Sequence, residues 1–299
     1  MNEKEITMEI KYTIKEQDLN KCINEIISNQ FHFSNRLLTK LIKSNKILLN
    51  NTPCDTRTCP KLDDLIIIKF DIEEDNSNII STEMKLDIIY EDNWLLVVNK
   101  PYGIPIHPSR MHFTDSLSNG VKYYFDLIGL SKKIRAVNRL DLNTSGLVIF
   151  AKCEYIQEEF IKQMSNHIFQ KTYLCLIEGA LDKNFGSISL PIARKTGSII
   201  ERCIKKEGHP SITNYKIIKK FEDYSLVECK LETGRTHQIR VHMSAMQHPL
   251  LGDTLYGHAS NLINRQALHS YKIDCIHPIS KTHLHFKANI PSDIRTLLF

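Results

Sequence analysis

The sequence lacks the features that mark membrane or exported proteins. No apolar run approaches the ~20 residues that a membrane-spanning helix requires. The start, Met1-Asn2-Glu3-Lys4-Glu5, has no apolar core of the kind that a signal peptide carries. We therefore expect a cytoplasmic protein that does not contact a membrane.

Motifs for nucleotide cofactors and for metals are also missing. Neither a Gly-x-Gly-x-x-Gly fingerprint nor a P-loop occurs. Of the eight cysteines, Cys54 and Cys59 are the closest two, with four residues between them and no second pair to complete a zinc site. Thirteen histidines are present without a His-Glu-x-x-His motif. We predict no bound metal and free thiols, with Cys175 and Cys229 buried in strands. A zinc hydrolase built on the C-terminal histidines is the alternative.

Length and charge set broad limits on what the protein does. At 299 residues the chain exceeds one average domain, so a large domain with a small one is the natural expectation. The formal net charge of +5 is mildly basic, which suits a nucleic-acid partner but also occurs in many other soluble enzymes. The charge therefore permits a nucleic-acid function without indicating one.

Residues 12–70 are predicted to form a small N-terminal domain. Ser34 is a candidate N-cap, and the leucines that follow it recur at helical spacing. Two strands are expected at 46–49 and 65–70, the first of them turned by Asn50-Asn51. The basic residues on the opposite face of the helix are Arg36, Lys40 and Lys43. This face is either a site for RNA phosphates or an ordinary solvated face.

The rest of the chain is predicted to be a linker followed by one large domain. Residues 71–84 are acidic and polar without a period, which is typical of a linker. From 85 to 299 short apolar strands alternate irregularly with helices, and the expected strands include 94–98, 147–151, 172–177 and 224–231. This irregular order indicates an α+β domain with a mixed sheet rather than a doubly wound fold.

Two polar segments of the large domain stand out. In Arg139-Leu140-Asp141-Leu142-Asn143-Thr144-Ser145-Gly146, a single carboxylate lies between an arginine and a turn, just before an apolar strand. A carboxylate without a second acid beside it suits a nucleophile or a lone base, and a loop ion pair is the alternative. In the second segment, residues 233–242, Thr236 is a candidate N-cap, and Arg240 falls on a different helix face from Ile239 and Met243.

Together with three further segments, these two resemble the RluA/RluD-type pseudouridine synthases, which isomerise uridine in structured RNA. The five segments, in the order of the family, are 99–108 (NKPYGIPIHP), 139–147 (RLDLNTSGL), 171–179 (KTYLCLIEG), 233–242 (TGRTHQIRVH) and 265–269 (RQALH) with His277-Pro278. Each segment alone is a weak signal, whereas all five in order form a strong one. The family usually has a histidine before Arg-Leu-Asp, and this chain departs from it with Asn138.

The resemblance implies three catalytic residues. The catalytic aspartate of the family falls on Asp141. Its arginine partner falls on Arg240, which is expected to hold the carboxylate with two hydrogen bonds, unless it is an ordinary surface arginine. The tyrosine of the family falls on Tyr173, which is expected to stack on the uracil and to offer its hydroxyl for the late removal of the C5 proton. An ordinary core tyrosine is the alternative.

The resemblance also implies RNA contacts beside the aspartate. Arg139 is expected to fill the gap that a flipped uridine leaves, with a phosphate or backbone contact as the alternative. Asn138 is included among the RNA-contacting residues and is expected to tune the loop by hydrogen bonding. Because isomerisation involves neither a redox step nor hydrolysis, no cofactor is expected.

The fold and partners implied by the resemblance complete the prediction. The fold is the pseudouridine-synthase fold, a central, largely antiparallel sheet with an RNA cleft across it, preceded by an S4-like RNA-binding domain at 12–70. The partner is RNA, with large-subunit ribosomal RNA favoured over transfer RNA, and the protein is expected to be a monomer. A non-catalytic RNA-binding or ribosome-assembly factor that merely keeps the fold is the alternative from another class.

Overall fold

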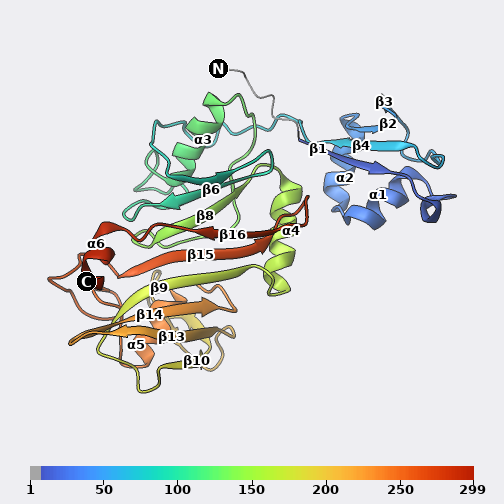
Figure 1. The fold of residues 1–299 in the computed structure, drawn as a ribbon. Helices are drawn as coiled ribbons and strands as arrows, with labels where there is room; N and C mark the ends of the chain where they lie inside the picture. The colour runs from blue at the N-terminus through green and yellow to red at the C-terminus, as the bar shows by residue number, and fades with distance from the viewer. Residues whose placement is uncertain (1–7) are drawn as a thin grey trace.

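The fold consists of a small N-terminal unit and a larger domain built on one long sheet (Figure 1). The structure is a computed structural model and describes residues 8–299. Strands and helices mix irregularly along the large domain, and its sheet is mixed. The predicted α+β class, with a small unit ahead of a large mixed sheet, is therefore confirmed.

The N-terminal unit is a four-stranded sheet packed against two helices. Its elements are β1 (Glu9–Thr13), η1 (Glu16–Asp18), α1 (Ile23–Phe31), α2 (Asn35–Lys43), β2 (Ile47–Leu49), β3 (Thr52–Pro53) and β4 (Leu65–Lys69), and the strand order is β1-β4-β2-β3. Ser34 caps α2 as predicted, because its hydroxyl accepts a hydrogen bond from the backbone N–H of Leu37 at 3.4 Å. Asn50 and Asn51 turn β2 into β3 with φ angles of 49° and 68°, a left-handed conformation that asparagine tolerates.

The large domain contains most of the regular structure. Its first half consists of β5 (Ile88–Glu91), β6 (Leu95–Lys100), α3 (Leu117–Leu127), β7 (Arg135–Ala136), β8 (Ser145–Ala151), α4 (Glu154–Ser165) and β9 (Gln170–Glu178). Its second half consists of β10 (Phe185–Ser189), β11 (Ile192–Arg194), β12 (Arg202–Ile204), β13 (Ile212–Lys220), β14 (Tyr224–Leu231), α5 (Gln238–Ala245), β15 (Leu268–Ile276), β16 (His283–Lys287), α6 (Ser292–Arg295) and η2 (Thr296–Leu298). The predicted strand at 224–231 coincides with β14.

The long sheet is mainly antiparallel and has one parallel junction at its centre. Its order is β10-β13-β14-β9-β15-β8-β6-β5, with β16 beside β15 and β7 beside β8. Strands β8 and β15 pair in parallel, with Gly146 opposite Ser270. Gly146 has a φ of +114°, and a Cβ there would lie 2.2 Å from the carbonyl oxygen of Ser270, so glycine is required at this crossing. This pairing starts β8 at Ser145, two residues before the predicted start at 147.

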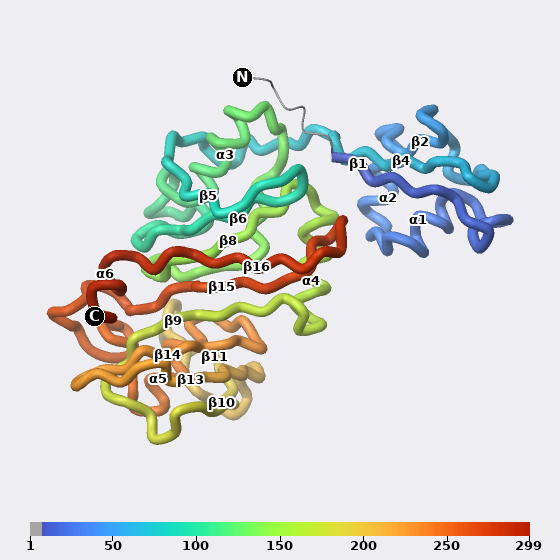
Figure 2. The backbone as a smooth tube through the Cα atoms, in the orientation of Figure 1, coloured from blue at the N-terminus to red at the C-terminus, as the bar shows by residue number. Residues whose placement is uncertain are grey.

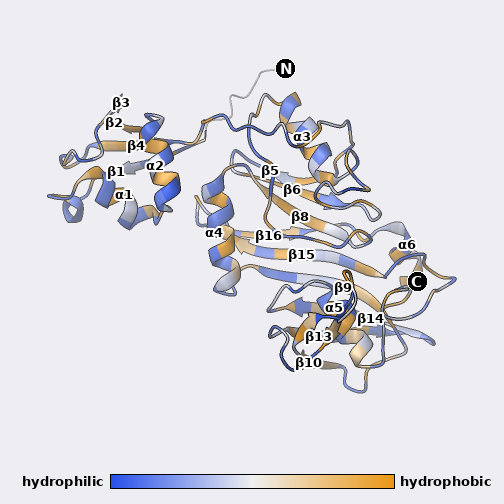
Figure 3. Cartoon of the chain, turned by 180° about the vertical axis from the view of Figure 1, so that it is seen from behind, coloured by the Kyte–Doolittle hydropathy of each residue, from blue (hydrophilic) through white to orange (hydrophobic). Residues whose placement is uncertain are grey.

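The centre of the long sheet forms the core of the large domain. Strand β8 is buried along its whole length and is mostly hydrophobic (Figure 3). Cys175 and Cys229 are buried free thiols on neighbouring strands, as predicted. No helix among residues 8–299 is long and apolar enough to cross a membrane.

Residues 71–84 contain no helix or strand and connect β4 to β5 (Figure 2). Their side chains anchor them to the large domain. The Glu74 side chain is only 7% exposed, and its two carboxylate oxygens each accept a hydrogen bond from Arg135 at 2.7 Å. Asn76 is buried and donates to the carbonyl oxygen of Lys132 at 2.9 Å. The segment predicted as a linker is therefore a strap with fixed contacts.

Helix α2 of the N-terminal unit contacts the same strap. The Lys40 ammonium lies 2.8 Å from Glu74 and 3.6 Å from Glu154 at the start of α4. Two carboxylates of the same chain thus pair with Lys40. We therefore do not expect Lys40 to contact RNA, in contrast to the prediction from the sequence. Arg36 and Lys43 are exposed, and no ion pair to either is found among residues 8–299.

Aromatic side chains complete the junction between the two units. The rings of Phe33 and Phe70 lie against Tyr155 of α4, with centroids 4.8 Å and 5.9 Å away. Phe70 also meets Trp94 edge to face, with centroids 5.6 Å apart. Such contacts bury large apolar surfaces, so the two units share one continuous core.

Candidate active site

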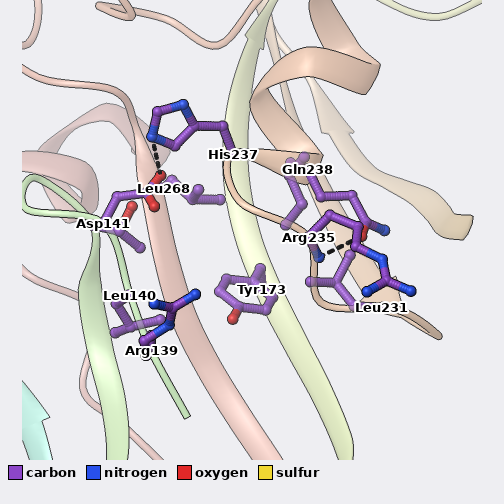
Figure 4. A pocket seen from close by; sticks show the side chains of 11 residues that line it. Arg139, Leu140, Asp141, Tyr173, Leu231, Arg235, His237, Gln238 and Leu268 are labelled. Carbon is purple, nitrogen blue, oxygen red and sulfur yellow. Dashed lines mark hydrogen bonds and ion pairs between the residues drawn. The ribbon is translucent and has the colours of Figure 1, made fainter. Parts of the chain in front are cut away.

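A pocket lies over the centre of the long sheet, where the loop after β7, strand β9 and the start of α5 come together (Figure 4). The polar residues that line this pocket include Arg139, Asp141, Tyr173, Arg235, His237 and Gln238. Two of the three predicted catalytic side chains, Asp141 and Tyr173, therefore face one pocket, although they are distant in sequence. The third, Arg240, contacts Asp141 from α5.

Buried cations fix the loop that carries Asp141. The ammonium of the fully buried Lys100 donates to three carbonyl oxygens, one of them that of Leu142 at 3.0 Å. Arg265, also buried, donates from Nη1 to the carbonyl oxygen of Asn143 at 3.0 Å. Because Leu142 and Asn143 directly follow Asp141, the two cations hold the backbone of the loop in place. Burial and the charge of Arg265 lower the pKa of Lys100 to about 7.

Arg240 lies between two carboxylates. Its Nη1 atom is 3.2 Å from Oδ2 of Asp141. Its Nε and Nη2 atoms donate to the two oxygens of Asp253 at 2.7 Å and 2.8 Å, and the Asp253 side chain is completely buried. Although burial opposes it, hydrogen bonding to Asp253 raises the pKa of Arg240. The bidentate contact that we expected at Asp141 is thus made with Asp253, which orients the guanidinium and leaves Nη1 to donate to Asp141.

The start of α5 differs from the prediction and brings a histidine to the site. The N-cap position is occupied by His237, in the left-handed region with φ 59°, and not by Thr236. The His237 ring holds the Tyr256 hydroxyl at 2.8 Å through Nδ1, and its Nε2 atom is 3.8 Å from the Asp141 carboxylate. Burial lowers the pKa of His237. His237 lies in the segment 233–242 that the sequence singles out, but no role was predicted for it.

Gln238 fixes the turn that precedes α5. Its side-chain nitrogen donates to the carbonyl oxygen of Ile212 at 2.9 Å and to the hydroxyl of Thr213 at 3.0 Å. Its side-chain oxygen accepts from the backbone N–H of Arg235 at 3.0 Å. Gln238 is buried, and both the oxygen and the nitrogen of its amide are hydrogen-bonded. It therefore holds in place the first turn of α5, the helix that carries Arg240.

Tyr173 lies on the floor of the pocket. It is only 5% exposed, and in Figure 4 its ring borders the pocket while its hydroxyl points away from Asp141. Its partner in register on β15 is Ser270. Burial raises the pKa of Tyr173, so the phenol is protonated at neutral pH.

Replacing Tyr173 with phenylalanine is expected to separate stacking from proton transfer. The variant Tyr173→Phe keeps the ring and loses the hydroxyl, so RNA affinity should hold while turnover falls by about a hundredfold or more, the scale of general acid–base catalysis. Binding and single-turnover assays on the same RNA measure the two effects. A wild-type rate in Tyr173→Phe would show that the tyrosine is only a core residue.

The two residues before the Leu-Asp pair have different surroundings. Arg139 is exposed at the rim of the pocket. Asn138 is only 5% exposed, its amide nitrogen donates to the carbonyl oxygen of Leu147, and its amide oxygen accepts from the backbone N–H of Ile149, both at 3.0 Å. It ties the loop to β8 by the hydrogen bonding that we expected, but its burial removes it from the set of RNA contacts.

The C-terminal histidines lie in separate environments. His242 of α5 is buried, with the Thr213 hydroxyl 2.9 Å from its ring, and His269 of β15 is buried, with the Ser145 hydroxyl 3.0 Å away. Among residues 8–299 no three His, Cys, Asp or Glu side chains are placed to hold a metal ion. The zinc-hydrolase alternative therefore finds no set of ligands in the part of the chain that the structure describes.

Asp253 is the main residue of the site that the sequence analysis missed. It lies in the loop after α5, in a short stretch with Leu250, Leu251 and Gly252. Its carboxylate also accepts hydrogen bonds from the backbone N–H groups of Leu255 and Tyr256 at 3.1 Å and 3.3 Å. A lone acidic residue in an apolar stretch is a signal that a buried cation partner exists, although it does not reveal which cation.

Comparisons with known proteins agree with this arrangement. The family model described as RNA pseudouridylate synthase matches residues 94–245, a range that includes Asp141, Tyr173 and Arg240. The RNA pseudouridine synthase YhcT of Bacillus subtilis (strain 168) is 34% identical over 99% of this chain and 98% of its own. The ribosomal large subunit pseudouridine synthase D of Neisseria meningitidis serogroup B is 33% identical over 89% of this chain and 74% of its own.

A solved structure gives the same result for the fold. The human RNA pseudouridylate synthase domain containing 1 superposes with a TM-score of 0.57 at 26% identity, covering 73% of this chain and 86% of that one. The expected pseudouridine-synthase fold is thereby confirmed. The chain belongs to the RluA/RluD-type family of RNA pseudouridine synthases, which are isomerases.

Proposed function

We propose that this enzyme converts particular uridines of large-subunit ribosomal RNA into pseudouridine, with Asp141 as the group that acts on the target nucleotide. The observation that carries the proposal is the Asp141 carboxylate, set in a pocket beside Tyr173 and held by Arg240 at 3.2 Å. The choice of RNA rests on the relatives named as ribosomal large subunit pseudouridine synthase D, among them the one from Neisseria meningitidis. We further propose that the enzyme acts as a monomer in the cytoplasm.

The reaction breaks the bond between N1 of the uracil and C1′ of the ribose, turns the base, and joins C5 to C1′. N1 ends with a proton, and C5 loses one. A carboxylate near the ribose can attack covalently or take a sugar proton once the glycosidic bond breaks, and Asp141 suits both roles. Arg240 orients the carboxylate through the hydrogen bond from its Nη1 atom. The Tyr173 ring offers a surface on which the turning uracil can stack.

A stacked uridine has to leave its helix or loop before it reaches this pocket, at a cost of about a few kcal/mol. Arg139 lies exposed at the rim, two residues from Asp141. Its planar guanidinium can stack in the gap that the flipped base leaves, which recovers part of that cost. Arg139 therefore belongs to substrate binding rather than to the chemical step.

Chemical mapping of pseudouridines tests the proposed target. Ribosomal and transfer RNA are derivatised and sequenced from cells with and without the gene, and from cells that carry Asp141→Asn. We expect one or more large-subunit sites to disappear in both altered strains. Loss of sites only in transfer RNA would move the target to that RNA, and loss of none in either RNA would contradict the proposal.

We interpret the N-terminal unit as the S4-like module that adds affinity for RNA. Helix α2 presents Arg36 and Lys43 to solvent, whereas Lys40 is paired with Glu74. The double variant Arg36→Gln/Lys43→Gln should therefore weaken RNA binding and lower the salt slope by roughly two units if both residues touch phosphate.

Lys40→Gln is the matched control for this experiment. It removes a charge from the same helix face, but that charge is already paired with Glu74 and Glu154 and so is not available to RNA. Its salt slope should stay at the wild-type value. The single-turnover rate at saturating protein should change little in the double variant, since Asp141 and its partners are untouched. Equal slopes for the double variant and the wild type would show that the face of α2 is merely solvated.

A further inference from the structure

Lys171 is a lysine close to the active site that has no part in the proposed reaction. It lies in β9, two residues before Tyr173, and side chains two apart on a strand share one face. Its partner in register on β14 is Leu231, which lines the pocket. Lys171 is thus placed on the pocket side of the sheet, next to the tyrosine.

The ammonium of Lys171 has no protein partner. Among residues 8–299 no carboxylate lies within ion-pair distance of its Nζ atom, and no backbone or side-chain oxygen accepts a hydrogen bond from it. The side chain is partly buried, and burial lowers the pKa of this lysine. Lys100 is buried too, but three carbonyl oxygens satisfy it. A charge taken partly out of water without a partner destabilises a protein, so this arrangement calls for a ligand.

The turn after β14 passes close to the ammonium of Lys171 and continues to the rim of the pocket. Gly234 lies in that turn, and a Cβ at this position would come within 2.9 Å of the Nζ atom of Lys171. The next residue, Arg235, lines the pocket and is exposed. Arg235 and Arg139 bring two further positive charges to the rim. The position of Lys171 therefore suits an anionic group that enters beside Tyr173.

We propose that Lys171 binds one phosphate of the RNA backbone next to the target uridine and so positions the flipped nucleotide over Tyr173. The inference rests on the proposed function, because RNA supplies the anion. A phosphodiester fits the position, since it carries one negative charge and accepts hydrogen bonds in several directions. Lys171 acts in this account as a positioning residue and takes no part in bond breaking.

The test compares Lys171→Met with the wild type and with Lys230→Met. Methionine keeps the apolar stem and removes the charge. Lys230 is an exposed lysine on the neighbouring strand, opposite Thr172 in register, so its side chain lies on the other face of the sheet. Binding to a large-subunit ribosomal RNA transcript should weaken about tenfold for Lys171→Met, with a salt slope lower by roughly one unit. Lys230→Met should bind like the wild type.

Stability gives a readout that a merely structural lysine would not produce. Removing a partly buried, unpaired charge should leave the free energy of unfolding of Lys171→Met equal to or above that of the wild type. A structural role predicts the reverse. Gly234→Ala retains the charge but places a methyl group against Nζ, so it should weaken RNA binding as well. A drop in stability with unchanged RNA affinity in Lys171→Met would overturn the proposal.

A neutral phosphate analogue identifies the contact itself. Oligoribonucleotides around a uridine that the wild type modifies are made with one methylphosphonate at a time on either side of that uridine. At the contacted position wild type and Lys171→Met should bind equally, while elsewhere the difference should persist, as in a double-mutant cycle. A constant difference at every position would refute a specific phosphate contact. Modification by the wild type is scored in the same series, so failure of the proposed function is seen separately from failure of the lysine contact.

Discussion

Asp141→Asn is expected to abolish pseudouridine formation while leaving the fold and RNA binding intact. The amide is nearly isosteric with the carboxylate, but it carries no charge and is a poor nucleophile. We expect the rate to fall by at least about a thousandfold, the scale seen when a catalytic nucleophile is removed. Single-turnover assays measure this loss directly, with the RNA in which chemical mapping locates the modified uridines.

The structure predicts that this variant stays folded. The Asp141 side chain is 25% exposed, and its ionisable partners are Arg240 at 3.2 Å and His237 at 3.8 Å. Arg240 keeps its two hydrogen bonds to Asp253 in the variant, so no buried charge is left unpaired. We expect a change in the free energy of unfolding of less than about 1 kcal/mol, as for other partly exposed ion pairs. More than a tenth of the wild-type rate in Asp141→Asn would contradict the assignment of the catalytic residue.

Local patterns in the sequence were enough to place many elements of the fold. Ser34 predicts the start of α2 because a capping hydroxyl serves the nearest N–H groups, which is a purely local contact. Asn50 and Asn51 predict their turn because asparagine tolerates left-handed backbone. The pairing of Asp141 with Arg240, by contrast, spans 99 residues. The resemblance to the pseudouridine synthases implied that contact, whereas local propensity could not predict it.

Features that depend on tertiary contacts were not predictable in this way. Thr236 has the usual N-cap chemistry, yet His237 takes the position because its ring bonds the Tyr256 hydroxyl from another loop. Lys40 has the spacing of an RNA-binding face, but the strap brings Glu74 to it from 34 residues away. In both cases a partner remote in sequence overrides a local signal.

The contact between Arg240 and Asp253 was likewise not predictable from local sequence. Because of it, we expect Arg240→Met to lower the free energy of unfolding strongly. Methionine removes the cation that holds Asp253, whose side chain is completely buried. Breaking a buried pair by removing one partner costs about 3–5 kcal/mol, because the remaining charge is left unpaired in the interior. Arg240→Met should therefore be much less stable than Asp141→Asn, and denaturant unfolding of both variants measures the difference.

The double variant Arg240→Met/Asp253→Asn separates stability from catalysis. Neutralising Asp253 removes the unpaired charge, and the asparagine oxygen can still accept from the N–H groups of Leu255 and Tyr256. Much of the lost free energy of unfolding should return. The rate should remain about a hundredfold or more below wild type, because Asp141 still lacks the cation that orients it. If the double variant regained both stability and activity, Arg240 would act only through Asp253. If it regained neither, the Asp253 charge would not be the cause of the instability.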